Sequence, residues 1–350
     1  MILVTGGTGL LGSRLLYDLT SHGERVRAIK RHSSSLDSVR RVFSYYNDSP
    51  SELLYRIEWV EADLMDVESL MEAMNNVSQV YHSAAQVSID DRDNEKLMNY
   101  NIIGTRNVVN ACLTKSVEKL CHVSSTSALG PPDQDGFIRE NSLWSSDYFH
   151  TVYSSSKYQS ELEVWRGIEE GLNTVIVNPS VILGPGFWNK GSSSMFSAIF
   201  RGLKFYTQGV TGFISVEDVS KAMISLMNSH YFGDRFILSS ENHSYKQVFD
   251  MIADSLGKKR PFIEATPFLG EMAFQYEKMK SIFGGKSLIT KEILISSHHK
   301  AYFSNDKFCT PFNLKFRSIE ETIRNMGEHF MKDLNDGWLD PKAKNWQKPS

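Results

Sequence analysis

The sequence predicts an α/β fold in which a doubly wound parallel sheet is followed by a smaller, mixed C-terminal lobe. The chain opens with an apolar run, a glycine-rich turn and an apolar-periodic helix within its first 21 residues. Its first half then alternates short apolar runs with helix-like segments. This alternation is typical of a parallel sheet covered by helices on both faces.

Six apolar segments are expected to form the strands in chain order: Met1–Val4, Arg25–Ile29, Arg56–Asp63, Val77–Ala85, Lys119–Thr126 and Asn173–Ser180. Four segments between them are expected to be helical: Leu10–Ser21, the polar stretch His32–Glu52, Leu97–Leu113 and Thr151–Glu170. Beyond Gly184 the pattern loosens, and Thr211–Met227 returns to a strand followed by a helix. A ligand of such a sheet binds at the carboxyl ends of the strands.

The glycine-rich turn between the first strand and the first helix has the residues of a phosphate cradle. Gly6 allows a tight turn, Gly9 lets backbone N–H groups approach a pyrophosphate, and Gly12 lets the helix pack closely on the strand. An ordinary glycine-rich loop is the alternative, but the strand-to-helix context favours dinucleotide binding. The cofactor-binding residues expected here are Thr5, Gly6, Gly7, Thr8, Gly9, Leu10, Leu11 and Gly12.

Composition and charge exclude several classes of partner. A net charge of −3 without a basic cluster argues against nucleic acid and against an anionic membrane surface. No apolar run approaches the roughly 20 residues of a membrane-spanning helix. Cys112, Cys121 and Cys309 lack metal-ligand spacing, so we expect free thiols, no metal and a reducing, cytoplasmic compartment. Because the first strand begins at Met1, no signal peptide is expected.

The chain is expected to divide into a dinucleotide-binding domain and a lobe that covers the cofactor cleft. Residues 1–184 form the domain, and 211–240 return to it. Residues 185–210 and 241–330 form the lobe, which binds the substrate. The polar segment 336–350 is expected to be a frayed tail.

Three side chains in the first half predict a proton relay. Tyr153 and Lys157 are four residues apart on one face of a predicted helix. A lysine ammonium beside a phenol lowers its pKa from about 10 toward the working range. The same Lys157 ammonium can hydrogen-bond the ribose of a nicotinamide nucleotide, so Lys157 is also expected to bind the cofactor. Ser125, in a serine cluster at a strand end, can hold a carbonyl oxygen while Tyr153 protonates it. The same spacing in Tyr276–Lys280 lies outside the alternating region and is interpreted as an ordinary helical pair.

The segments TGGTGLLG, VSSTSALG and YSSSK together resemble the extended short-chain dehydrogenase/reductases of the epimerase/dehydratase superfamily. The resemblance covers nearly all of residues 1–330. It implies a Rossmann fold, a nicotinamide cofactor and catalysis by Ser125, Tyr153 and Lys157, with Asn101 steadying the lysine and an active-site water. Further cofactor contacts implied by the resemblance are Asp63 and Leu64 at the adenine, Ser83, Ala84 and Ala85 at the ribose, and Pro179, Ser180 and Val181 at the nicotinamide. A capping or packing role is the alternative for Asn101, and termination of a strand is the alternative for Asp63.

Cofactor choice is expected to depend on the end of the second strand. An acidic residue there would bind a ribose 2′-hydroxyl. This chain has Lys30 and Arg31 instead, and a guanidinium suits a 2′-phosphate. We therefore favour NADP(H), with Arg31 as the main determinant and Lys30 as its helper. NAD(H), with a solvated pair of charges, is the alternative.

The residues expected around the substrate distinguish reductases from nucleotide-sugar enzymes of the family. The latter commonly carry an arginine where this chain has Thr211, and NPSVILGP resembles the dihydroflavonol and cinnamoyl-CoA reductase group. Phe187 and Trp188 suit an apolar or aromatic substrate, and packing within the lobe is their equal alternative.

The sequence thus predicts an NADPH-dependent oxidoreductase that reduces an aldehyde or ketone, a small carbonyl or hydroxyl substrate. The alternatives are a nucleotide-sugar epimerase or dehydratase with tightly bound NAD, a 3β-hydroxysteroid dehydrogenase-like enzyme, and a non-catalytic dinucleotide sensor. The resemblance also implies a homodimer through the helices near Leu97–Leu113 and Tyr153–Gly167.

Overall fold

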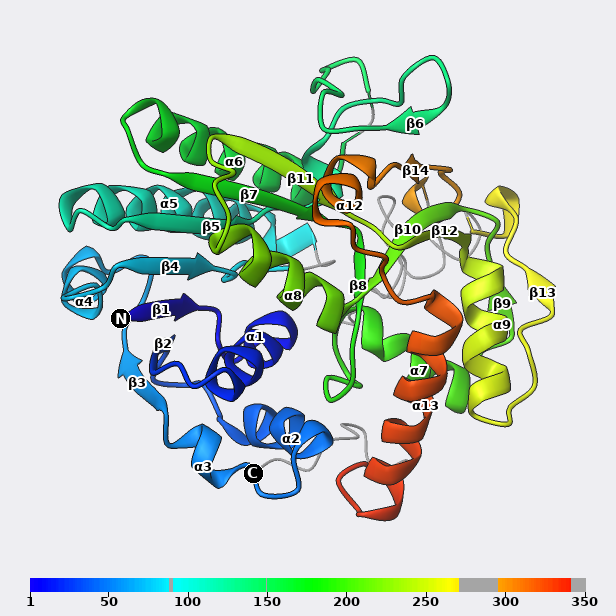
Figure 1. The fold of residues 1–350 in the computed structure, drawn as a ribbon. Helices are drawn as coiled ribbons and strands as arrows, with labels where there is room; N and C mark the ends of the chain where they lie inside the picture. Colours follow the sequence, from blue (N-terminus) through cyan, green and yellow to red (C-terminus); the bar gives the residue numbers. More distant parts are fainter. Residues whose placement is uncertain (88–90, 149, 271–294, 341–350) are drawn as a thin grey trace.

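A seven-stranded parallel sheet, the main sheet, forms the centre of a computed structural model that describes residues 1–87, 91–148, 150–270 and 295–340 (Figure 1). Its strands, in spatial order, are β3 (Ile57–Glu61), β2 (Val26–Lys30), β1 (Ile2–Thr5), β4 (Gln79–His82), β5 (Lys119–Val123), β7 (Thr174–Pro179) and β11 (Asp234–Leu238). Every neighbouring pair is parallel. The doubly wound parallel sheet predicted from the sequence is confirmed.

The strand order reverses between β1 and β4. From β1 the chain passes to β2 and β3 on one side, and it then returns to β4 on the other side. Thr5 at the end of β1 lies beside His82 at the end of β4. The loops that follow these two strands therefore diverge, which opens a crevice for a ligand at this point.

Helices cover both faces of the main sheet (Figure 1). Helices α1 (Leu10–Ser21), α2 (Asp37–Tyr46) and α8 (Val216–Met227) pack on one face, around Leu16, Phe43 and Met223. Helices α4 (Val67–Ala73), α5 (Asn94–Thr114) and α6 (Val152–Glu169) pack on the other, around Val108 and Val164. Both faces are thus removed from water, as the near-continuous apolar strands require.

One predicted helix is wrong in its extent. The stretch His32–Glu52 forms two helices, α2 and the short α3 (Ser51–Leu54). Asn47 ends α2 in an extended conformation, and Pro50 stands at the start of α3. A proline lacks a backbone N–H and disfavours the helical conformation of the residue before it, so one helix cannot run through this segment.

The range 211–240 is divided between two sheets. Strand β10 (Val210–Ser215) pairs with β8 (Val181–Leu183) and β12 (Glu241–Ser244) in a separate three-stranded sheet. Helix α8 and strand β11 pack with the main sheet, and Ile214 of β10 belongs to the core on the same face. The extra sheet needs Gly212, because a Cβ there would lie 2.2 Å from the Ser239 hydroxyl oxygen.

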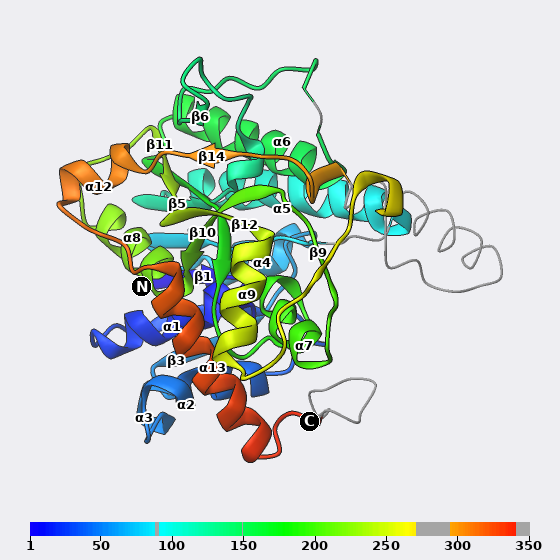
Figure 2. The ribbon, with the colours of Figure 1, turned by 90° about the vertical axis from the view of Figure 1, so that its right-hand side faces the viewer.

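The C-terminal lobe is built on this small sheet. Figure 2 shows α7 (Ser194–Phe200), α9 (Tyr245–Ser255) and α13 (Ile319–Asn335) side by side. Their shared core contains Phe196, Ile252 and Phe330. The remaining short elements are β6 (Phe137–Ile138) with β14 (Tyr302–Phe303), β9 (Phe205–Tyr206) with β13 (Ile263–Glu264), α12 (Asp306–Phe312), η1 (Asp91–Asp93), η2 (Thr126–Ala128) and η3 (Gly191–Ser193).

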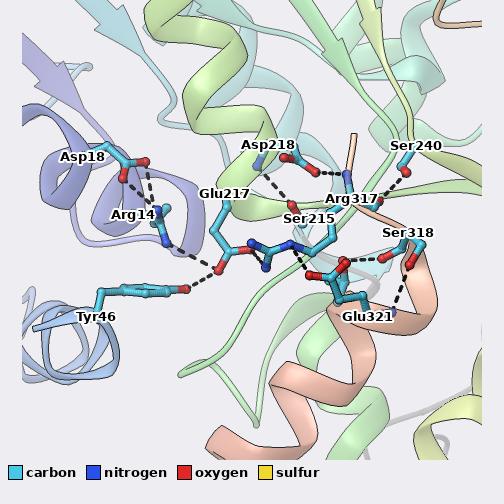
Figure 3. Close-up of polar contacts among 11 residues, drawn as sticks. Arg14, Asp18, Tyr46, Ser215, Glu217, Asp218, Ser240, Arg317, Ser318 and Glu321 are labelled. Carbon is cyan, nitrogen blue, oxygen red and sulfur yellow. Dashed lines mark hydrogen bonds and ion pairs between the residues drawn. The ribbon is translucent and has the colours of Figure 1, made fainter. Parts of the chain in front are cut away.

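A buried polar cluster joins the lobe to the helices of the main sheet (Figure 3). Glu217, in the first turn of α8, accepts hydrogen bonds from Arg14 of α1, Tyr46 of α2 and Arg317 before α13, at 3.4, 2.8 and 3.0 Å. The backbone N–H of Arg317 donates to Asp218 at 2.8 Å. A single carboxylate therefore holds three helices and the entry to a fourth.

Other sequence predictions can be placed on the described part of the chain. Within it, no helix is long and apolar enough to cross a membrane, and no cluster of His, Cys, Asp and Glu could hold a metal ion. Cys112 and Cys121 are buried free thiols, and Cys309 is partly buried. Tyr276–Lys280 and residues 341–350 of the tail lie outside the described residues. Leu339, at the start of the expected frayed tail, is instead buried in the lobe core.

Candidate functional site

The phosphate cradle Thr5–Gly12 borders a cleft of about 550 Å³ at the carboxyl ends of β1, β2 and β4. Gly6 has a positive φ of 72°, and a Cβ there would lie 2.6 Å from the Ala84 amide nitrogen. A Cβ on Gly12 would lie 2.1 Å from the Gly6 carbonyl oxygen. The tight turn and the close approach of helix to strand both require glycine, so the residues present fit the pyrophosphate of a dinucleotide.

Helix α1 begins at this cleft with Gly9 as its N-cap, and no described side chain caps it. The first backbone N–H groups of a helix have no partner within the helix and favour an anion. The end of β1 is fixed beside them, because Ser83 donates to the Thr5 carbonyl at 2.7 Å and the Thr5 hydroxyl contacts His82 Nδ1 at 2.7 Å.

The structure brings most of the predicted cofactor residues to this cleft. Those that line it are Thr5, Gly6, Thr8, Gly9, Lys30, Arg31, Leu64, Ser83, Ala84 and Ala85. Those that do not line it are Gly7, Leu10, Leu11, Gly12, Asp63, Pro179, Ser180 and Val181. Gly7 instead faces Leu16 of α1, and the Asp63 carboxylate accepts from the Met65 N–H at 3.0 Å.

The cations at the end of β2 have unequal surroundings. Lys30 forms an ion pair of 3.5 Å with Glu61 at the end of β3, and His32 contacts the same carboxylate at 2.8 Å. The hydrogen bond from His32 is the main reason that the pKa of Glu61 is lowered. Arg31 is exposed, with its guanidinium carbon 5.9 Å from the Tyr100 ring centroid. Arg31 is thus the better placed cation for a phosphate.

Sequence reasoning missed two other features of this cleft. Lys190, in the loop after β8, lines it, and so does Phe187 of the same loop. The only sequence signal for Lys190 was a cation inside a Gly/Ser-rich loop. This loop lies about 160 residues along the chain from Arg31, so only the folded structure shows that it returns to the cleft.

The predicted relay residues meet at the carboxyl end of β5. Ser125 follows β5 and starts η2, where its hydroxyl accepts from the Ser127 N–H at 3.1 Å. Thr151 caps α6, which places half-buried Tyr153 in its first turn. Burial raises the pKa of Tyr153, and a side-chain hydrogen bond with Ser125 opposes that rise.

Lys157 lies one turn beyond Tyr153 and is only 3% exposed. Its ammonium donates to the Val123 carbonyl at 2.8 Å. Burial lowers the pKa of Lys157 to about 8, and the charge of Glu161 opposes this. The predicted lowering of the Tyr153 pKa by Lys157 is not found in this arrangement, because the ammonium is directed at the backbone of β5 and burial dominates at the phenol.

Asn101 is buried, and its contacts differ from those implied by the resemblance. Its side chain accepts from the Gln86 N–H at 2.7 Å and donates to the Gln86 carbonyl at 3.0 Å and to Ser156 at 3.0 Å. The loop after β4 is thereby tied to α6, which carries Tyr153 and Lys157. Asn101 therefore positions this loop, which lines the cofactor cleft.

A second pocket, of about 330 Å³, adjoins the phenol of Tyr153. Its walls come from both parts of the molecule: Leu129 after β5, Ile138 of β6, Thr211 of β10, Tyr245 of α9 and Phe303 of β14. The Tyr148 hydroxyl and His299 Nε2, which also line it, are 2.5 Å apart. None of the described residues that line this pocket is Lys or Arg.

The two predicted substrate residues are not in that pocket. Trp188 is fully buried, packs on Phe196 and Phe330, and donates to Asp333 at 2.6 Å. Of the two roles left open for Trp188, lobe packing is the one the structure shows, because both its ring and its N–H are used by the lobe core. Phe187 lines the cofactor cleft instead.

Comparison with known proteins assigns the family. Residues 2–237 match the model of the NAD dependent epimerase/dehydratase family. The chain belongs to this family. It is an NAD(P)-dependent enzyme of the extended short-chain dehydrogenase/reductase type, and the family resemblance drawn from the sequence is confirmed.

Curated relatives of this family member include several reductases. The chain is 29% identical over 273 residues to sterol demethylase protein B of Methylococcus capsulatus, covering 76% of this chain and 78% of the relative. It is 31% identical over 265 residues to tetraketide alpha-pyrone reductase 2 of Arabidopsis thaliana (71% and 81%). It is 26% identical over 267 residues to a bifunctional dihydroflavonol 4-reductase/flavanone 4-reductase of Pyrus communis (72% and 76%).

Solved structures of the family share the fold over nearly the whole chain. The crystal structure of gox2253 matches with a TM-score of 0.78 and 28% identity, covering 95% of this chain and 98% of that one. UDP-glucose 4-epimerase of Thermus thermophilus in complex with NAD matches with a TM-score of 0.71 and 20% identity (94% and 98%). At that identity the second likeness shows the fold alone.

Proposed function

We propose that this enzyme uses NADPH to reduce an apolar or aromatic aldehyde or ketone. The observation that carries the proposal is the pocket beside Tyr153, whose walls combine aliphatic and aromatic side chains with uncharged polar ones and whose described lining residues include no Lys or Arg. Such a pocket suits a neutral carbonyl compound, with a few polar groups to orient it. The reductases among the relatives support the same class of reaction.

The chain's own residues supply the proton side of the reaction. Tyr153 donates a proton to the carbonyl oxygen, and Ser125, which hydrogen-bonds the phenol, orients that oxygen. Burial keeps Tyr153 protonated at neutral pH, as an acid in the reductive direction must be. The bound nicotinamide supplies the hydride. Lys157 provides a buried positive charge one turn away, and its ammonium can hydrogen-bond the ribose of the bound nicotinamide nucleotide.

NADPH is favoured over NADH by the difference between Lys30, which is paired with Glu61, and Arg31, which is exposed at the cleft. Glu61 already has Lys30 and His32 as partners, so its charge is partly neutralised at the cleft. Arg31 and Lys190 both line the cleft and can meet an additional phosphate. Their charges would gain less from the uncharged 2′-hydroxyl of NADH.

The nucleotide-sugar alternative is less well supported. A diphosphate needs a charged clamp, and the position where related enzymes commonly have arginine is Thr211, which lines the pocket of this chain. A non-catalytic sensor would need only the cradle, whereas this chain also joins Ser125 to Tyr153. The cytoplasmic location and the homodimer through α5 and α6 stay predictions.

The proposal is tested by releasing and identifying any nucleotide that copurifies with the protein, and then following NADPH oxidation. The carbonyl panel contains aromatic aldehydes, aromatic ketones, a steroid ketone and a UDP-sugar. We expect oxidation of NADPH with one of the aromatic or steroid carbonyl compounds. Tightly held NAD, together with interconversion of the UDP-sugar and no net NADPH oxidation, would overturn the proposal in favour of an epimerase.

A further inference from the structure

A buried carboxylate lies one helical turn beyond Lys157. Glu161 is 1% exposed, and four side chains donate hydrogen bonds to it. The donors are Ser124 at 2.5 Å, Arg235 at 2.8 Å, Asn178 at 2.9 Å and Trp165 at 3.2 Å. A buried carboxylate without such partners would be strongly unfavourable. The proposed proton relay gives Glu161 no role.

Glu161 is connected to the backbone that carries Ser125. The Asn178 amide group that donates to Glu161 also donates to the Ser125 carbonyl oxygen at 3.0 Å. Ser124, the residue before Ser125, donates to the same carboxylate from its hydroxyl. The end of β5 is therefore held by hydrogen bonds of both Ser124 and Ser125. Its orientation toward Tyr153 depends on the carboxylate of α6.

Arg235 fixes Glu161 from the far strand of the main sheet. This residue of β11 pairs with Glu161 at 2.8 Å and donates to the Glu140 carbonyl oxygen at 2.8 Å. The Glu140 carboxylate in turn accepts from the Ile237 N–H at 2.8 Å. These bonds link Glu161 to β11 as well as to the strand end that carries Ser125.

Glu161 is also the negative charge that acts on the Lys157 ammonium, which burial alone would drive toward its neutral form. The other titratable groups packed around Lys157 do not replace it. His82 of β4 and His122 of β5 are fully buried, and burial and the charge of Lys157 lower the pKa of both imidazoles, which are therefore neutral. Tyr153 is the remaining group on α6.

We propose that Glu161 is a positioning residue that holds the strand end carrying Ser125 and keeps the Lys157 ammonium charged in the working pH range. The inference rests on the proposed carbonyl reduction, in which Ser125 and Lys157 act. Arg235 and Asn178 belong to the same hydrogen-bond network. Arg235 fixes the Glu161 carboxylate, and Asn178 links this carboxylate to the backbone carbonyl of Ser125.

The test compares Glu161→Gln with Glu163→Gln in the pH profile of kcat and of kcat/KM for NADPH-dependent reduction. Glu163 lies two residues along the same helix, pairs with Arg166 at 3.0 Å and is partly exposed, so it is a matched control. Without the charge of Glu161, Lys157 loses its proton at lower pH. We expect the alkaline limb of the E161Q profile to move to lower pH, so that the loss of activity relative to wild type grows as pH rises. The E163Q profile should match that of wild type.

If Glu161 acts only on the strand end, E161Q lowers activity by the same factor at every pH and leaves the limb in place, and that result would overturn the proposed action of Glu161 on Lys157. Because E161Q leaves the Arg235 guanidinium without its carboxylate, the double variant Glu161→Gln/Arg235→Met provides a second test without a buried unpaired charge. It should show a displacement of the limb in the same direction, smaller than in E161Q because the repulsion between Arg235 and Lys157 is removed as well. Tyr153→Phe separates the two proposals: substantial turnover in Y153F refutes the proposed relay, whereas loss of turnover in Y153F with an unmoved limb in E161Q refutes only the role of Glu161.

Discussion

At the scale of single residues, the proposed preference for NADPH depends on which cation is free to meet a phosphate. Lys30 is paired with Glu61, whereas Arg31 is exposed at the cleft with its guanidinium near the Tyr100 ring. Two neighbouring cations of similar charge are therefore expected to contribute differently. A sequence identifies both, but the partner of Lys30 comes from a different strand and cannot be located from the sequence alone.

Arg31→Ala should weaken NADPH binding about tenfold or more, because a charge-assisted hydrogen bond to a phosphate is lost. NADH binding should change little. Fluorescence titration with both nucleotides measures the two dissociation constants, and Arg40→Ala on α2, an exposed arginine paired with Asp37, is the control. Equal weakening of both nucleotides in R31A would show that Arg31 does not contact the 2′-phosphate.

At the scale of elements, the glycines of the cradle have separate tasks. Gly12 brings α1 against the turn, where a Cβ would lie 2.1 Å from the Gly6 carbonyl oxygen, whereas a Cβ on Gly9 would meet the same oxygen at 3.3 Å. The sequence predicts this strand, turn and helix well because all their constraints are local. The split of His32–Glu52 and the separate sheet of β10 depend on Pro50 and on contacts of Gly212 with distant residues.

Gly12→Ala should lower the free energy of unfolding by about 1–3 kcal/mol, the usual cost of overpacking, and should also abolish tight cofactor binding. Gly9→Ala should weaken cofactor binding with a much smaller loss of stability. Urea denaturation and nucleotide titration of both variants separate packing from ligand approach. Equal losses of stability in the two variants would contradict this division of tasks.

At the scale of the whole molecule, the lobe is attached through buried acids. Asp333 of α13 is fully buried and accepts hydrogen bonds from Arg41 and Tyr45 of α2 and from Trp188 of the loop after β8. Together with the Glu217 cluster, it joins α2, which follows the cofactor-selecting strand, to the loop that carries Phe187. These partners lie 145 to 292 residues from Asp333 in sequence, which is why Trp188 could be mistaken for a substrate residue.

Asp333→Ala should cost about 3–5 kcal/mol of stability, because it leaves the largely buried Arg41 charge without its main partner. Asp336→Ala, which removes the more exposed partner of the same arginine, should cost less than about 1 kcal/mol. Chemical denaturation monitored by tryptophan fluorescence compares them. Similar stabilities for the two variants would show that Asp333 does not anchor the lobe.

The cradle and the Ser125, Tyr153 and Lys157 set could be predicted because each is a short motif on one strand end or one helix turn. The substrate pocket could not, because its walls come from β6, β10, α9 and β14, which converge only in the folded chain. Arg235 was missed for the same reason, since it meets Glu161 across 74 residues of sequence. The spacing of Glu161 four residues after Lys157 was the one available signal for the buried acid.

The most direct measurement of the central claim is single-turnover oxidation of NADPH by wild type and Tyr153→Phe with the best carbonyl substrate of the panel. Loss of the proton donor should slow the chemical step by about 10²–10⁴-fold, while the dissociation constant for NADPH stays near the wild-type value. A Y153F enzyme that reduces the carbonyl compound at close to the wild-type rate would contradict the assignment of Tyr153 as the proton donor.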